Sequence, residues 1–210
     1  MNRIAVVGAH YDDAELGCGG TILKFVDEGW KVDILVITDS EYSTYDGELI
    51  RGKETAEEEG RLAASYMGAS VECLNARTKH VHCTSWLIEE INLFLDKVAP
   101  TYIFAHWIGD LHEDHNEVAR ATLVAARHFP SLFVFRSNWY HSPMDFVGNV
   151  YVDISKYMGK KEELLRIHET EYKRRGLAWT DFINTRAREA GLRIGVDYAE
   201  EFNAAKLLLR

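Results

Sequence analysis

Short apolar runs alternate with longer amphipathic stretches along most of the chain. The apolar runs are rich in Val, Ile, Leu and Phe, and they predict strands at 4–8, 32–38, 71–74, 102–106, 132–135 and 150–154. Runs that are apolar at nearly every position and are separated by helices are typical of parallel strands buried on both faces. The pattern therefore predicts an α/β fold of Rossmann-like type, with three α/β/α layers around a mostly parallel sheet.

The helices that we expect in the gaps end at recognisable signals. Gly29 and Gly68 can end two of them, and Pro100 and Pro130 lie just beyond two others. The predicted helices are 19–28, 51–67, 84–98, 114–128, 156–174 and 181–190. The sequence has no internal repeat, low-complexity tract or Pro/Ser-rich linker, so we expect residues 1–210 to form one domain.

Composition narrows the class of partner. The formal net charge of -9 argues against a nucleic-acid or anionic-membrane surface. The 3 cysteines lack CxxC spacing, which favours free thiols over a disulfide framework or a cysteine-rich zinc knuckle. No stretch resembles a signal peptide or membrane span, so we expect a cytoplasmic protein. The oligomeric state stays open, with a homo-oligomer as one alternative.

Two clusters of His and Asp carry the candidate chemistry. His10-Tyr11-Asp12-Asp13 follows the first predicted strand, and a second cluster at 110–115 follows the fourth. Ligands of such sheets bind outside the carboxyl ends of the strands, so the clusters can converge there. One His and one Asp from the first loop and one His from the second would give the three ligands of a catalytic zinc site. A carboxylate and an imidazole would remain for proton transfer.

Each residue also has a simpler interpretation. Asp12, Asp13 or Asp114 can cap the helices that follow, and single loop histidines are usually only solvated. The spacing of His112 and His115 on either side of Asp114 favours the metal site, because one imidazole can bind metal while a carboxylate orients the other and keeps it protonated. Glycines after the first strand suggest a dinucleotide loop instead, but Ile22 stands where that motif needs its third glycine.

The segment His10–Thr21 resembles the His-Pro-Asp-Asp-x-Glu-x-x-x-Gly-Gly-Thr signature of the PIG-L/LmbE family of N-acetylglucosaminyl deacetylases. His112-Glu113-Asp114-His115 resembles the family's His-Pro-Asp-His. Arg51–Glu54 is similar to its Arg-x-x-Glu helix, and Val152–Ser155 with Lys161 and His168 is similar to its strand and closing helix. Two departures stand out: Tyr11 replaces the usual proline, and His168-Glu169-Thr170-Glu171 differs from the usual His-x-Ser-Gln.

The resemblance implies a role for each matching residue. Zinc would be held by His10, Asp13 and His115, although Fe²⁺ or another divalent ion suits the same ligands. Asp12 would be the general base. His112, oriented by Asp114, would stabilise the oxyanion or protonate the departing amine.

Substrate contacts are expected from other segments. Arg51 matches an arginine that the family associates with substrate, with a solvated residue in the first turn of a helix as the alternative. The loops 39–50 and 138–149 are long and carry aromatic residues, which suits a substrate wall. Among these aromatics, Trp139 would stack on a sugar ring unless it only packs locally.

Together these features predict a zinc-dependent hydrolase that removes an N-acetyl group from a small-molecule conjugate of the N-acetylglucosamine type. A metal-dependent hydrolase of another amide or ester is the nearest alternative. A metal-independent nucleotide-binding module and a catalytically silent relative are the others.

Overall fold

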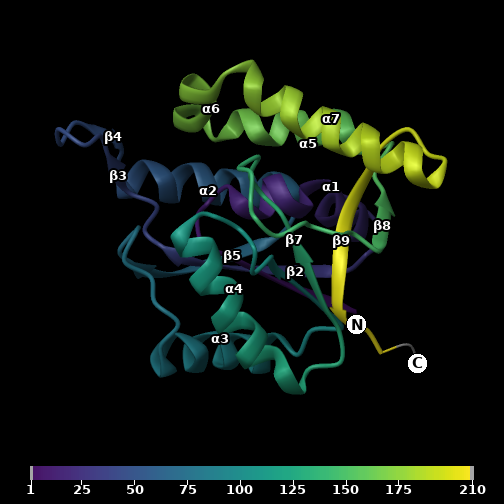
Figure 1. The fold of residues 1–210 in the computed structure, drawn as a ribbon, viewed down its shortest axis with the longest axis horizontal. Coiled ribbons are helices and arrows are strands. Elements are labelled where there is room, and N and C mark those ends of the chain that lie inside the picture. The colour runs from purple at the N-terminus through teal and green to yellow at the C-terminus, as the bar shows by residue number, and fades with distance from the viewer. Residues whose placement is uncertain (1, 209–210) are drawn as a thin grey trace.

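The computed structural model describes residues 2–208 and centres on a seven-stranded sheet (Figure 1). In spatial order the strands are β5 (Ser70–Ala76), β2 (Lys31–Thr38), β1 (Arg3–Gly8), β6 (Tyr102–His106), β7 (Leu132–Phe135), β9 (Ala199–Lys206) and β8 (Val150–Asp153). The first five strands in this order are parallel, and β9 runs antiparallel to both of its neighbours. The prediction of a mostly parallel sheet is confirmed.

Strand β1 lies where the order of the strands reverses. Ile4 pairs with Val32 of β2 on one side and with Tyr102 of β6 on the other. The β1 residues 4–7 are fully buried, as continuous apolar runs predict for a central parallel strand. The carboxyl ends of β1 and β6 therefore open side by side at the position where ligands bind in such sheets.

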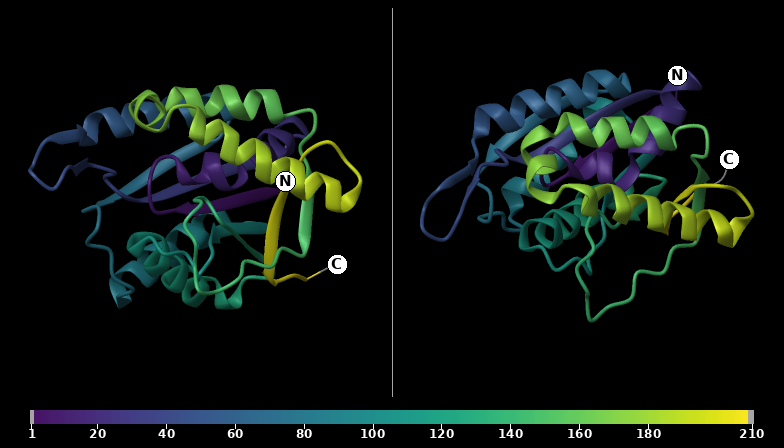
Figure 2. Two further views of the ribbon diagram at one scale, coloured as in Figure 1. Left: turned by 45° about the horizontal axis from the view of Figure 1, so that its top comes forward. Right: turned by 90° about the horizontal axis from the view of Figure 1, so that it is seen from above.

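Helices cover both faces of the sheet (Figures 1 and 2). One face carries α1 (Asp13–Asp27), α2 (Lys53–Met67), α5 (Met158–Ile167), α6 (Glu169–Arg175) and α7 (Leu177–Ile194). The other face carries α3 (Ser85–Val98) and α4 (Glu113–Ala125), which a short 3₁₀ turn at Ala126–His128 extends. Separate apolar clusters fill the two interfaces, so the three-layer prediction is confirmed.

Some element boundaries differ from the predicted ones. Helix α1 begins directly at Asp13 and contains a non-helical residue, Cys18, with φ -146° and ψ 21°. The helix predicted at 156–174 is divided at His168 into α5 and α6. A small hairpin of β3 (Tyr42–Ser43) and β4 (Leu49–Arg51) forms within the loop at 39–50. Both views of Figure 2 show this hairpin projecting from the body.

The glycines after β1 allow close packing. A Cβ atom on Gly17 would lie 2.3 Å from the ring of Phe135, and one on Gly20 would lie 2.8 Å from Ile154. The amide of Gly20 donates to Glu200 of β9 at 2.9 Å, so a protein carboxylate rather than a ligand phosphate binds this turn. The structure therefore favours the packing interpretation of these glycines over a dinucleotide loop.

No helix within residues 2–208 has both the length and the apolar content needed to cross a bilayer.

Candidate metal centre

Three consecutive parallel strands supply the side chains of the centre at their carboxyl ends. The loop after β1 gives His10, Asp12 and Asp13, the segment after β6 gives His112 and His115, and Ser137 follows β7. These six residues line one cavity of about 420 Å³. The expectation that the two sequence clusters meet at one edge of the sheet agrees with this arrangement.

The nitrogen and oxygen atoms of His10, Asp13 and His115 that could bind a metal lie close together. The separations are 3.1 Å between His10 Nδ1 and His115 Nε2, 3.2 Å between His115 Nε2 and Asp13 Oδ1, and 3.4 Å between His10 Nδ1 and Asp13 Oδ2. The ligand atoms of a tetrahedral zinc ion with bonds of about 2.0–2.1 Å lie about 3.4 Å apart. The three side chains therefore have the chemistry and the spacing to hold a small divalent cation.

Asp13 is held by several donors in addition to the two histidines. The His10 amide donates to Oδ2 at 2.7 Å and the Ser137 hydroxyl donates to Oδ1 at 3.1 Å. His106 Nε2 lies 3.0 Å from Oδ2, and His106 is fully buried behind the carboxylate. The possible metal-ligand atoms of Asp13, His106 and His115 lie within 4.8 Å of one another, and so do those of His10, His112 and His115. Because His106 does not line the cavity, we assign it to the support of Asp13.

The second ring nitrogen of His10 and that of His115 each face a carboxylate. His10 Nε2 lies 3.0 Å from Asp114 Oδ2, and His115 Nδ1 lies 3.1 Å from Asp110 Oδ2. Carboxylates in such positions fix the orientation of a metal-binding imidazole and increase its basicity. The expectation that Asp114 orients His112 is therefore wrong, because the carboxylate of Asp114 contacts His10 instead.

The charges around His10, Asp13 and His115 favour the binding of cations, both protons and metal ions. Burial alone would lower the pKa of His115, but Asp13 and Asp110 outweigh burial and raise that pKa to about 10. Burial likewise opposes a raised pKa at His10, yet contacts with Asp114 and Asp13 raise it to about 9. Burial also works against ionisation of Asp13, but His115 and His106 hold its pKa well below the usual range. A site that attracts protons onto its imidazoles in this way also attracts a metal cation.

Asp12 lines the cavity but is not one of the three side chains, His10, Asp13 and His115, that lie close together there. It occupies the N-cap position of α1, but its side chain makes no capping hydrogen bond. The capping interpretation of Asp12 is therefore wrong. Burial and the neighbouring charge of Asp13 raise the pKa of Asp12, which makes its carboxylate a stronger base than an ordinary aspartate.

His112 is a neutral imidazole beside the centre. Burial, followed by the charges of His10 and His115, lowers its pKa to about 3, so it is not kept protonated as we expected from the sequence. Its Nδ1 accepts the amide hydrogen of Asp114 at 3.3 Å, which makes His112 the N-cap of α4. In this tautomer Nε2 carries the hydrogen and is a donor. Asp114 does not cap α4, contrary to the simpler interpretation.

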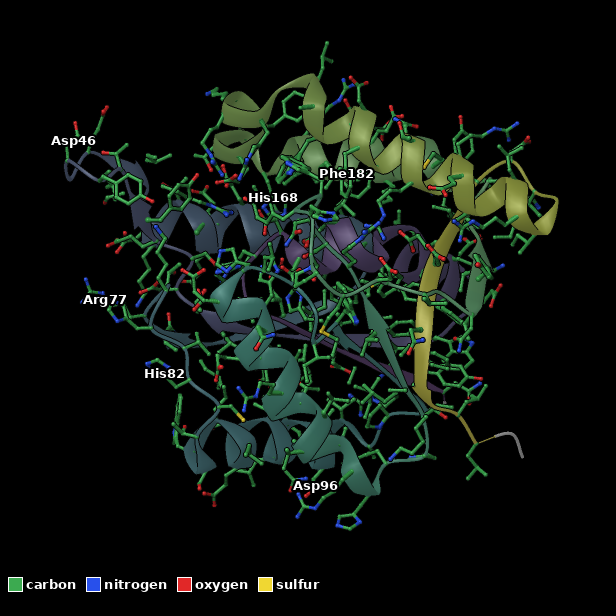
Figure 3. The ribbon with its side chains drawn as sticks, in the orientation of Figure 1. Asp46, Arg77, His82, Asp96, His168 and Phe182 are labelled. Carbon is green, nitrogen blue, oxygen red and sulfur yellow. The ribbon has the colours of Figure 1, made fainter. Side chains whose placement is uncertain are left out.

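Arg51 is buried rather than solvated. It ends β4, lines the cavity and is 3% exposed, so the solvated-helix interpretation is wrong. Its Nη2 pairs with Glu59 at 3.0 Å and lies 3.2 Å from His168 Nδ1, while Nη1 lies 3.9 Å from Asp12. Figure 3 labels His168 below α6, and this side chain is fully buried.

The two long loops reach the cavity as expected. Tyr42 and Tyr45 of the first loop line it, and so do Trp139 and Tyr140 of the second. The guanidinium of Arg175 lies 5.1 Å from the ring centre of Trp139 and covers one face of that ring.

Several supporting residues were not predicted as site residues. His106 and Asp110 stand in the segment before the second motif, and their closeness to the end of β6 was the available signal. Glu59 gave no signal, and His168 was noted only as part of the segment that resembles the family's closing helix. Their contacts with Arg51 depend on helices that meet it from distant parts of the chain.

A group of His and Asp side chains that could hold a metal ion, with a further carboxylate and imidazole in the same cavity at the switch point of a parallel sheet, is typical of metal-dependent α/β enzymes. Residues 5–126 match the family model described as PIG-L, GlcNAc-PI de-N-acetylase. The chain belongs to this family. The resemblance seen in the sequence motifs is thereby confirmed, and the family's description names the hydrolysis of an amide bond.

Known proteins resemble the chain over nearly its full length. The diacetylchitobiose deacetylase of Thermococcus kodakarensis is 27% identical over 95% of this chain and 82% of its own. The structure of the N,N'-diacetylchitobiose deacetylase of Pyrococcus horikoshii superposes with a TM-score of 0.81 at 21% identity, covering 97% of this chain and 83% of that one.

A third comparison limits what the fold alone can say. The 4-carboxy-2-hydroxymuconate hydratase of Pseudomonas putida has a TM-score of 0.82 at 19% identity, covering 100% of this chain and 98% of that one. A protein with this fold can therefore carry out a reaction other than deacetylation, and the choice of reaction depends on the residues of the site.

Proposed function

We propose that the protein is a zinc-dependent hydrolase that removes the N-acetyl group from a small N-acetylglucosamine-type conjugate, with residues 1–210 acting as one catalytic domain. The observation that carries this proposal is the joint presence, in one cavity, of the His10/Asp13/His115 group and two uncommitted groups, Asp12 and His112. Family membership and the named deacetylase relative support the acetyl amide as the bond that is cleaved.

His10, Asp13 and His115 would hold the ion. When bound, zinc supplies a Lewis acid that polarises the amide carbonyl and lowers the pKa of water. Fe²⁺ or another divalent ion suits the same donor set, because two imidazoles and a carboxylate do not select one metal.

Asp12 would accept the proton of the attacking water and deliver it to the departing nitrogen. Its position in the cavity supports both transfers, and its raised pKa makes it a stronger base than an ordinary aspartate. Arg51, which lies 3.9 Å from Asp12, would keep this carboxylate oriented and contact the substrate.

His112 would donate a hydrogen bond from Nε2 to the carbonyl oxygen as negative charge develops there. Its low pKa favours this role over that of a stored proton for the leaving amine. Trp139 would line the sugar site with its remaining ring face and edge.

The first test is a panel of N-acetylglucosamine conjugates incubated with zinc-loaded protein and assayed for free amine. Release of amine with acetate from at least one conjugate is expected. Hydrolysis confined to esters, or hydration of an unsaturated carboxylic acid without any amine release, would reject the deacetylase proposal in favour of another reaction on the same fold.

The second test separates the two adjacent carboxylates. Asp13→Ala should lose zinc, whereas Asp12→Asn should keep zinc and fold yet lose on the order of 10² to 10⁴ in kcat, because a base acts mainly in the transition state. Zinc content and kcat of the purified variants are the measurements. Asp46→Asn, at the tip of the β3–β4 hairpin labelled in Figure 3, is the matched control and should change neither.

Full activity of Asp12→Asn, or equal loss of zinc in both variants, would contradict the division between base and ligand.

A cytoplasmic location also belongs to the proposal. The free state of Cys18, Cys73 and Cys83 supports it, since paired cysteines are typical of oxidising compartments.

A further inference from the structure

The loop after β5 carries a strained residue at the edge of the cavity. Lys79 has a φ of 65°, in the left-handed region that favours glycine. Figure 3 labels Arg77 and His82, which lie on either side of it in the sequence. The Lys79 side chain is exposed and lines the cavity, as do those of Thr78 and His10. Strained residues of this kind are typical of functional sites.

Hydrogen bonds on both sides hold Lys79 in this conformation. Its amide donates to Asp114 Oδ2 at 2.8 Å, and the amide of Val81 donates to Asp114 Oδ1 at 3.3 Å. On the other side, the Thr78 hydroxyl donates to Asp39 Oδ1 at 2.8 Å. These bonds explain why residue 79 is left-handed. They do not explain why it is a lysine, because glycine would make the same amide bond without the strain.

The other non-glycine residues with positive φ differ from Lys79. Within residues 2–208 they are Ser40, Asn75 and Ala99. Ala99 ends helix α3 in a common left-handed cap, and asparagine tolerates this region, so neither residue needs a ligand to explain it. The hydroxyl of Ser40 accepts the amide hydrogen of Tyr11 at 3.1 Å, which gives that side chain a structural use. None of these explanations applies to the side chain of Lys79.

The ammonium group of Lys79 makes no contact with the rest of the protein that would explain its position. Among residues 2–208, Lys79 forms a hydrogen bond through its backbone amide but none through its side chain, and it has no ion pair. Other cations of the cavity are paired, Arg51 with Glu59 and Arg174 with Glu171. All three N–H groups of the Lys79 ammonium are therefore available to oxygen atoms of a ligand.

The backbone of Lys79 is close to the candidate metal centre. Asp114, which accepts the Lys79 amide hydrogen, lies 3.0 Å from His10 Nε2. A substrate whose amide lies at His10, Asp13 and His115 would therefore have its sugar near the Lys79 side chain.

We propose that Lys79 is a specificity-determining residue that donates hydrogen bonds from its ammonium group to oxygen atoms of the bound sugar conjugate. This proposal rests on the proposed function for the identity of the sugar. Hydroxyl and ring oxygens of a sugar are acceptors, and a charged donor binds an acceptor about twice as strongly as a neutral donor does. The left-handed backbone then serves to direct this donor toward the cavity.

The test compares methyl N-acetylglucosaminide with N,N'-diacetylchitobiose. Lys79→Met keeps the strained backbone but removes the donor, so KM should rise roughly tenfold, the effect of losing one charge-assisted hydrogen bond, with kcat within about twofold. Lys79→Gly should raise KM equally and also raise the denaturant midpoint of unfolding, because glycine removes the strain. A rise for both compounds places the contact on the first sugar, and a rise for the disaccharide alone places it on the second.

Asn75→Gly is the matched control. Asn75 has a similar φ of 57° but lies outside the cavity, so glycine there should leave both KM values unchanged. The zinc content of the Lys79 variants should equal that of the wild type, since their amide still donates to Asp114. An unchanged KM in Lys79→Met would overturn the substrate contact. Loss of zinc from Lys79→Met would also overturn it, because the residue would then act through the metal ligands.

If the wild-type protein releases no amine from either compound, the proposed function fails for these sugars, and calorimetric binding of the same compounds to zinc-loaded protein tests the contact alone. Binding that Lys79→Met weakens and Asn75→Gly does not would still support it. Equal binding by the wild type and Lys79→Met, or an absence of binding, would reject it.

Discussion

Neighbouring carboxylates in this centre differ in role because their oxygens contact different partners. Asp13 faces His10 and His115, whereas the adjacent Asp12 faces the cavity. Asp114 contacts His10 from the side opposite Asp13, and the amides of Lys79 and Val81 donate to it at 2.8 and 3.3 Å. The loop at 79–81 thus holds in place the carboxylate of Asp114, which would support the metal through His10.

This arrangement predicts different defects for two residues of one motif. Asp114→Ala should weaken zinc affinity by about 10–100-fold, the usual cost of losing a carboxylate behind a histidine ligand. His112→Ala should leave zinc affinity near normal and lower kcat by roughly 10²-fold, because a hydrogen bond to the developing oxyanion is lost. Zinc titration of the metal-free variants and kcat of the loaded ones measure both effects. Comparable loss of zinc from the two variants would contradict the assignment.

At this scale the sequence predicted which side chains meet but not how they pair. His10, Asp13 and His115 could be grouped because each directly follows a strand end or begins a helix there. The pairing of Asp114 with His10 depends on a backbone segment that approaches from residues 79–81. Periodicity and motif spacing contain no information on such an approach.

The loop between β1 and α1 is fixed by Tyr11, which stands where the family usually has proline. Its amide donates to Ser40 Oγ at 3.1 Å, a bond that a proline cannot make. Its ring is buried against α2, where Gly60 leaves room for it. The loop therefore gains from side-chain packing the stiffness that a proline ring would otherwise provide.

A methyl group on Gly60 should disturb this contact. The Cβ of alanine would lie 2.1 Å from Tyr11 Cδ1, so Gly60→Ala should destabilise the fold by about 1–3 kcal/mol, the usual cost of overpacking. Denaturant unfolding measures the loss. The control is Gly159→Ala in α5, where nothing lies within 4 Å of the new Cβ and stability should stay equal or rise.

A double-mutant cycle identifies the cause. If Gly60→Ala costs as much in a Tyr11→Ala background as in the wild type, the clash with Tyr11 is not the reason for the instability.

Among the elements, strands with apolar runs were predictable from the sequence, and the polar strand β9 was not. The six predicted strands all exist. Five of them belong to the parallel part of the sheet, and the sixth, β8, is an edge strand that pairs antiparallel with β9. Strand β9 was missed because Ala199–Lys206 is rich in Ala, Glu and Asn, which disfavour strands. Hydrogen bonding to β7 and β8 on both sides overrides that preference.

For the whole molecule, metal binding and folding should be linked. His10 and Asp13 follow β1, and His115 follows β6. An ion held by these three residues would therefore connect two distant parts of the chain. Zinc at about a hundred times its Kd should add about 2.7 kcal/mol to stability. For a chain of this length that corresponds to a rise in Tm of about 5–10 °C over the chelated protein.

Thermal unfolding with chelator and with restored zinc measures this shift. His115→Ala should show the same Tm in both conditions. A zinc-dependent rise that survives in this variant would mean that the stabilising ion binds elsewhere.

The last strand of the sheet has a consequence for the way the protein is made. Glu200 of β9 accepts the amide hydrogens of Gly20 and Thr21, which are separated from it by 180 and 179 residues. During synthesis on the ribosome, the amides of Gly20 and Thr21 in α1 therefore lack this partner until almost the entire chain has been made. At about 5–20 residues per second, this delay is roughly 10–40 seconds. The edge of β7 is unpaired from the synthesis of Phe135 to that of Lys206, roughly 4–14 seconds at the same rate, so the nascent chain needs protection from aggregation during this time.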